Sequence, residues 1–139
     1  MSGFPVSMKL LVEEFSKMPG IGPKSAQRLA FYILRSSKAD AEALSRAVIK
    51  VKDSVRFCRI CNNLSDEEMC EICKSSSRNR HLLCIVEEPN DIITIERAHN
   101  FNGVYHVLLG SLSPLDGIGP SDLKIKELLD RVKREHFKE

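Results

Sequence analysis

The sequence predicts an α+β fold in three modules: a helical N-terminal part, a cysteine-rich module with a linker, and a parallel α/β unit. Three observations predict it. Apolar residues recur at helical spacing in residues 1–56, four of the five cysteines lie in the aperiodic residues 57–80, and residues 81–139 alternate strand-like apolar runs with helical patterns. At 139 residues the chain can hold one ordinary domain or two to three small ones.

Three helices are expected in the first module. Apolar spacing over residues 8–15 predicts the first helix, which Pro19 and Gly20 end. The second begins at Pro23, because proline suits the first turn of a helix. Asp40 is expected to cap the third helix. The apolar residues that share one face of this third helix are Leu44, Ala47, Val48, Val51 and Val55.

The last module has the order strand, helix, strand, helix. The strands are expected at residues 82–86 and about 105–109, and the helices at about 91–99 and 123–137. Strand, helix and strand in this order predict a parallel βαβ unit. Because a parallel sheet normally has more than two strands, we expect the chain to be C-terminally truncated.

Charge is unevenly distributed along the chain. Residues 1–80 carry 14 Lys and Arg against 9 Asp and Glu, whereas residues 81–139 carry 7 against 10. The first part therefore suits a polyanion. The longest apolar runs are far shorter than the roughly 20 residues of a membrane helix, and the N-terminus lacks the features of a secretory signal. We expect a cytoplasmic protein with reduced thiols and no membrane contact.

A glycine-rich turn between the first two helices carries a helix-hairpin-helix signature. Its two glycines allow a tight turn, and main-chain amides at the start of the second helix can face a phosphate. Lys24 and Arg28 lie four residues apart on one helical face and can add two cationic contacts to the DNA backbone. The candidate DNA-binding residues are Gly20, Ile21, Gly22, Lys24 and Arg28. The alternative is a plain turn beside a solvated charged face; the position between two apolar helices favours binding.

Four cysteines form two Cys-x2-Cys pairs separated by eight residues, the strongest chemical signal in the chain. They are Cys58, Cys61, Cys70 and Cys73. Two such pairs predict one closed tetrahedral Zn²⁺ site, which is structural because four thiolates leave no position for water. Arg56, Arg59 and Lys74 are expected to offset its negative charge. A redox dithiol is the weaker alternative. Cys84 is expected to be a small core residue.

An acidic loop follows the first predicted strand of the last module. Glu87 and Glu88 lie at the carboxyl end of that strand, where ligands of open α/β sheets bind, and Asp116 is the one plausible further acid. These three residues are a possible partner site or vestigial magnesium site. The alternative, which we favour, is that the two glutamates are surface acids near a helix N-terminus. None of the four histidines has the spacing of a catalytic triad.

Taken together, residues 18–31, the four cysteines, residues 86–92 and residues 112–120 resemble the RecR family of bacterial recombination mediators. The resemblance implies that the last module is the first part of a Toprim domain, with Glu87 at that superfamily's acidic position. It implies a role with RecO and RecF in loading RecA onto gapped DNA coated by single-strand-binding protein. It also implies ring-like tetramers that clamp DNA, with Lys24 and Arg28 lining the hole. Because the family's C-terminal tail, which contributes to tetramer assembly, is absent, a homodimer made through the N-terminal helices is expected as the alternative to a tetramer.

Three hypotheses about function follow. The first is a mediator, not an enzyme, that binds single- and double-stranded DNA without reading sequence. The alternative is a Toprim-type enzyme that uses Glu87 and Mg²⁺ on phosphodiesters. In the third, the zinc module is only a platform for protein partners.

Overall fold

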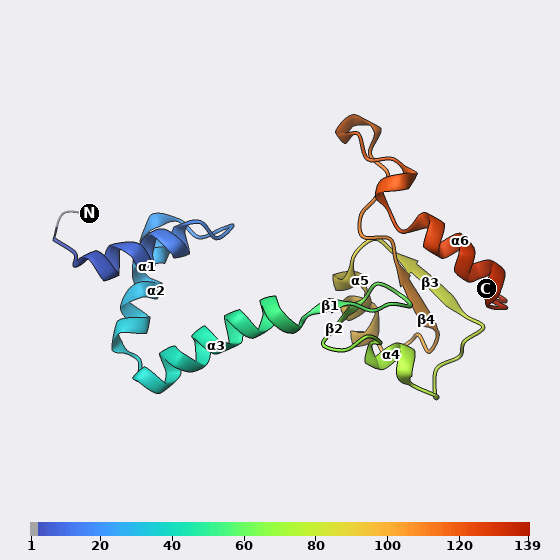
Figure 1. The fold of residues 1–139 in the computed structure, drawn as a ribbon, viewed down its shortest axis with the longest axis horizontal. Helices are drawn as coiled ribbons and strands as arrows, with labels where there is room; N and C mark the ends of the chain where they lie inside the picture. The colour runs from blue at the N-terminus through green and yellow to red at the C-terminus, as the bar shows by residue number, and fades with distance from the viewer. Residues whose placement is uncertain (1–2) are drawn as a thin grey trace. The chain divides into compact units, whose positions relative to one another are not determined.

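The computed structural model describes residues 3–139, which form two compact units, one through Lys52 and one from Asp53 to Glu139. Figure 1 shows the course of the chain. Among the described residues, no helix has the length and apolar character needed to cross a lipid bilayer.

The first unit consists of helices, as its periodicity predicts. They are α1 (Val6–Ser16), α2 (Pro23–Arg35) and α3 (Lys38–Ser54), the last of which runs across the boundary into the second unit. α1 and α2 pack through Val12, Ala26 and Ala30, which are almost fully buried. Small alanines on α2 allow the two helices to approach closely, and larger apolar residues close the rim of the contact. These are Met8, Leu11, Phe15 and Ile21.

Two features of α3 differ from expectation. Asp40 does not cap it: the helix begins at Lys38, and the Ser37 hydroxyl accepts a hydrogen bond from the Asp40 amide at 3.1 Å while donating to the Asp40 carboxylate at 2.6 Å. Ser37 is thus the capping residue, and Asp40 in the first turn accepts a hydrogen bond from its hydroxyl. The expected apolar face is present, but none of its residues is buried within the described chain, and Val48 is 56% exposed.

The second unit contains two small sheets. Its elements are β1 (Arg56–Phe57), β2 (Leu64–Ser65), α4 (Glu71–Lys74), β3 (Leu83–Val86), α5 (Pro89–Arg97), β4 (Val104–Val107), two 3-10 turns at Pro114–Asp116 and Pro120–Asp122, and α6 (Ile125–Arg134). β1 and β2 pair antiparallel, and β3 and β4 pair parallel with Leu83 opposite Val104 and Val86 opposite Val107. The predicted βαβ unit is confirmed.

The parallel pair carries the core of the second unit. On one face, Tyr105 and Val107 of β4 pack with Val86 and with Ile92 of α5. On the other face, His106 is fully buried and its Nε2 lies 2.9 Å from the carbonyl oxygen of Lys124, just before α6. Burial lowers the pKa of His106, because it disfavours the charged imidazolium. His106 therefore connects β4 to the residue just before α6 within the core.

A partly buried polar network connects the linker after the cysteine module to the core. The Arg78 guanidinium donates two hydrogen bonds to the Glu96 carboxylate, at 2.9 and 2.5 Å, and the Tyr105 hydroxyl donates to the same carboxylate at 2.6 Å. The hydrogen bond from Arg78 is the main cause that lowers the pKa of Glu96. Charge-assisted bidentate pairs of this kind fix a linker more firmly than a single surface ion pair does.

Replacing Glu96 with glutamine should destabilise the second unit and reduce the dependence of its stability on pH. Because the pKa of Glu96 is lower in the folded chain than in the unfolded chain, its contribution is present above pH 4.5 and is lost as the pH falls. We expect a loss of about 2 kcal/mol at neutral pH. Thermal unfolding between about pH 7 and pH 3 measures both effects. Glu71→Gln, at a side chain that is 90% exposed, is the control and should leave the stability unchanged; equal curves for Glu96→Gln and the parent chain would contradict the assignment.

Candidate functional site

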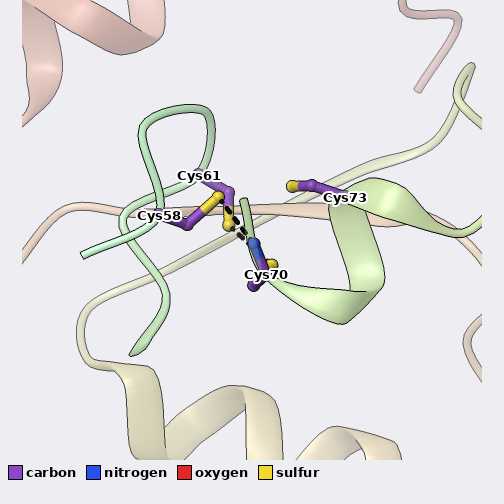
Figure 2. Close-up of side chains that lie close together, drawn as sticks. All are labelled: Cys58, Cys61, Cys70 and Cys73. Carbon is purple, nitrogen blue, oxygen red and sulfur yellow. Dashed lines mark hydrogen bonds between the residues drawn. The ribbon is translucent and has the colours of Figure 1, made fainter. Parts of the chain in front are cut away.

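The four cysteines converge on one point. Cys58 and Cys61 lie on the loop between β1 and β2, and Cys70 and Cys73 lie at and within α4 (Figure 2). All four are at least 97% buried, and their sulfur atoms lie within 4.8 Å of one another. In the described residues, this is the one cluster of three or more side chains that could hold a metal ion. The site therefore has the closed four-thiolate geometry that structural Zn²⁺ requires.

The backbone around the cysteines is arranged to stabilise thiolates. The amide of Asn63 donates to Sγ of Cys61 and the amide of Cys70 donates to Sγ of Cys58, each at 3.4 Å. Asn62, directly after Cys61, has a φ of 62°, in the left-handed region that tight turns use. The site thus suits a metal through its main-chain amides as well as through its four sulfur atoms.

The close packing of the sulfur atoms also shifts the pKa values of neighbouring thiols in opposite directions. The hydrogen bond between Cys61 and Cys70, whose sulfurs lie 3.6 Å apart, raises the pKa of Cys61 and lowers the pKa of Cys70. A cluster of four sulfurs cannot carry four negative charges without a compensating cation. Zn²⁺ supplies that charge when bound, which allows all four cysteines to act as thiolate ligands.

Two of the three cations expected to offset the site's charge, Arg59 and Lys74, are paired with nearby acids. Lys74 pairs with Glu67 at 2.6 Å and with Glu71 at 3.3 Å, and Arg59 lies 3.9 Å from Glu68. Their charges are therefore shared with neighbouring carboxylates. Two main-chain amides also support the thiolates, because they donate hydrogen bonds to the sulfurs.

The cysteine loop is also bound to the edge of the parallel sheet, which the sequence did not indicate. The amide of Val107 in β4 donates to the carbonyl oxygen of Cys61 at 2.7 Å, and the Asn62 side chain donates to the Val107 carbonyl at 3.2 Å. On the same edge the buried guanidinium of Arg131 donates to the Tyr105 carbonyl at 2.6 Å. The zinc module therefore occupies part of an edge that a further strand could otherwise pair with.

The hairpin between α1 and α2 has an open, donor-rich surface. Gly20 has a φ of +78°, which a residue with a side chain rarely adopts, and a side chain at Gly22 would meet open space. Ile21 packs against the buried cluster of α1 and α2, as expected. Within residues 3–139 the amides of Gly22, Lys24 and Ser25 donate no hydrogen bond, since the first one in α2 runs from Ala26 to Gly22.

Two cations stand beside these amides. Lys24 and Arg28 lie one turn apart on α2 and are exposed. α2 contains no acidic residue, and Pro23 occupies its first turn. Unpaired amides, the positive end of the helix dipole and two flanking cations together make this terminus chemically suited to bind a phosphate.

The three acidic candidates do not form a cluster. Glu87 follows β3 and its carbonyl oxygen accepts from the Gly110 amide at 2.9 Å. The Glu88 amide donates to the Asp91 carboxylate at 2.9 Å, so the chain around Glu88 forms the N-terminus of α5. Asp116, in a separate 3-10 turn, accepts from the Ser113 hydroxyl at 2.5 Å. Among the described residues, the metal-binding geometry found at the cysteines is not repeated at these acids.

Comparison with known proteins assigns each part of the chain to a family. Residues 8–52 match the family described as RecR, helix-hairpin-helix, residues 55–75 match the four-cysteine zinc finger domain of RecR, and residues 81–136 match the Toprim domain. The cysteine cluster is thus a zinc finger that holds one structural Zn²⁺ per chain.

Curated relatives resemble the chain along most of its length. Recombination protein RecR of Acidobacterium capsulatum is 54% identical over 134 residues, which cover 96% of this chain and 67% of the relative. The same-named proteins of Koribacter versatilis and Desulforudis audaxviator are 53% and 49% identical and are covered over 66% and 64% of their lengths. The chain spans about two thirds of the length of the curated relatives it matches. With a helix-hairpin-helix, a four-cysteine zinc finger and a Toprim segment in this order, the chain belongs to the RecR family.

Proposed function

We propose that this chain binds the sugar-phosphate backbone of single- and double-stranded DNA through the hairpin at the start of α2, without reading base sequence. The observation that carries the proposal is the set of unpaired amides at Gly22, Lys24 and Ser25 beside the exposed cations Lys24 and Arg28. Amides at a helix N-terminus with flanking cations suit the negative charge of a phosphate, and contacts to phosphate carry no sequence information.

The wider role that we propose is that of a recombination mediator. The curated relatives are named recombination proteins, and the family resemblance implies action with RecO and RecF to help load RecA on gapped DNA. A single hairpin makes few phosphate contacts, so it should bind weakly. Assembly of the chain into a homodimer or tetramer would present several hairpins to one DNA molecule and so raise the affinity.

The arrangement of the acids favours binding over catalysis. Two-metal phosphoryl chemistry needs carboxylates that converge on shared ions. The Asp91 and Asp116 carboxylates accept local hydrogen bonds, and Glu87 and Glu88 are exposed at the end of β3. We therefore propose that the Toprim segment is a non-catalytic part of the protein.

The native chain should bind unrelated DNA sequences with equal affinity, and the affinity should fall steeply with salt. We expect log Kd to rise linearly with log salt concentration, at about 0.9 per phosphate contact on duplex and about 0.7 on single strands. Fluorescence anisotropy with labelled oligonucleotides of several sequences measures both properties. Strong preference for one sequence, or an affinity that does not respond to salt, would contradict backbone binding.

A further inference from the structure

The face of α2 that points away from α1 carries more than the two cations of the proposed phosphate site. Ala26 and Ala30 are fully buried against α1. With 3.6 residues per turn, the opposite face of the helix contains Arg28 and Arg35, with Lys24 at one margin and Tyr32 at the other. One continuous face therefore presents three cations and an aromatic ring.

Tyr32 is unusually exposed for a large ring. The residue is 68% exposed, whereas the neighbouring Phe31 is 37% exposed and contacts Phe4 at a ring-centre distance of 5.7 Å and the Arg35 guanidinium at 6.0 Å. The Tyr32 hydroxyl makes no hydrogen bond with another described residue, unlike the hydroxyl of Tyr105. A ring left open in this way contributes little to the α1–α2 contact and is available to a partner.

Two shallow hollows meet at Tyr32. One, of about 380 Å³, is lined by Ser25, Arg28, Leu29 and Tyr32. The other, of about 390 Å³, is lined by Arg28, Phe31, Tyr32 and Arg35. Each hollow thus places a guanidinium beside the same exposed ring. A cationic group that holds a phosphate next to a ring that can stack on a base is the combination by which proteins bind single-stranded nucleic acid.

We propose that Tyr32 is a base-stacking position for single-stranded DNA, with Arg28 and Arg35 holding the phosphates on either side of the stacked base. The inference rests on the proposed function, because it extends the phosphate site at Lys24 and Arg28 along the helix. Arg28 and Arg35 are separated by seven residues, about 10 Å along α2, which leaves room for a base between them. Bases of an intact duplex are already stacked and paired, so this position should favour single strands.

Charge argues against a second copy of the chain as the occupant of this face. If two copies paired through a two-fold axis here, the three cations of one α2 would meet those of the other, and α2 offers no acid to balance them. The neighbouring exposed Leu29 and Leu34 still make this occupant worth testing. The mass of the chain in solution distinguishes this occupant from DNA.

Tyrosine fluorescence tests the proposal directly, because the chain has two tyrosines and no tryptophan. The second, Tyr105, is fully buried, so Tyr105→Phe leaves Tyr32 as the emitting side chain. When the full Tyr105→Phe chain is saturated with a thymidine oligonucleotide, the emission of Tyr32 should fall by half or more. If that variant does not fold, the difference in emission between the native chain and Tyr32→Phe gives the same signal.

Affinities provide the second measurement. Tyr32→Ala should weaken binding of the thymidine oligonucleotide about tenfold and binding of a duplex of equal length less than twofold, whereas Tyr32→Phe should bind both like the native chain. Unchanged emission together with unchanged affinity of Tyr32→Ala would overturn the stacking proposal while leaving the hairpin proposal standing. A Tyr32→Ala chain that changes mass but keeps its DNA affinity would assign the face to a second copy and also overturn it. If the native chain bound no DNA, both proposals would fall.

Discussion

Removal of zinc is expected to unfold the cysteine module and to expose the edge of the parallel sheet. Structural Zn²⁺ contributes apparent binding energies of about 10–16 kcal/mol, comparable with the stability of a whole domain. The loop at Cys61 also accepts the hydrogen bond from the Val107 amide. Loss of the metal should therefore affect β4 as well as the ligands, and lower the Tm of the second unit by more than about 10 °C.

Hydrogen exchange at single amides resolves this prediction. After treatment with a strong chelator, the Val107 amide should exchange much faster, whereas amides within α1 and α2 should keep their protection, since that pair has its own core. Cys73→Ser should reproduce the loss without a chelator, and Cys84→Ser, outside the cluster, should retain one zinc ion per chain. Full protection of Val107 in the metal-free chain would show that the finger and the sheet are independent.

Reversal of both hairpin cations is expected to abolish most DNA binding. Two lost phosphate contacts make the salt slope shallower by about 1.8, which corresponds to roughly 60-fold weaker binding at 0.1 M salt relative to 1 M. In Lys24→Glu with Arg28→Glu, repulsion adds to this loss, so we expect an effect of about 100-fold or more. Both side chains are exposed, so the fold of the unit should not change.

The sequence predicted the elements whose signals are local. Pro23 in the first turn, and Pro19 with Gly20 before it, located the boundary between α1 and α2, and apolar runs located β3 and β4. The predicted first residues of α5 and α3 differ from the structure, because each helix start depends on a hydrogen bond to one side chain. α5 begins at Pro89, before the expected residue 91, because proline suits a first turn and the Asp91 carboxylate accepts from the Glu88 amide. Ser37 with Asp40 is an equally local capping signal, and it places the cap at Ser37 instead of Asp40.

Contacts between distant parts of the chain could not be predicted in the same way. The amide of Val107 and the carbonyl of Cys61 meet only after both the finger and the sheet have formed. Arg131 lies in a strongly charged helix and would be expected in solvent, yet it is 2% exposed, because its guanidinium reaches a carbonyl on the sheet edge and the Glu135 carboxylate. Tyr32 carried no signal in the sequence either; its significance depends on how open its face of α2 is.

The most direct test of the account is a DNA titration of Lys24→Glu with Arg28→Glu beside a variant of equal net charge. Lys38→Glu with Lys50→Glu reverses two exposed cations of α3 and serves as that control. We predict that anisotropy of a labelled oligonucleotide shows binding weakened by about 100-fold and a shallower salt slope for the hairpin variant alone. If both variants lost affinity equally, or neither did, DNA would not be bound through the amides and cations at the start of α2.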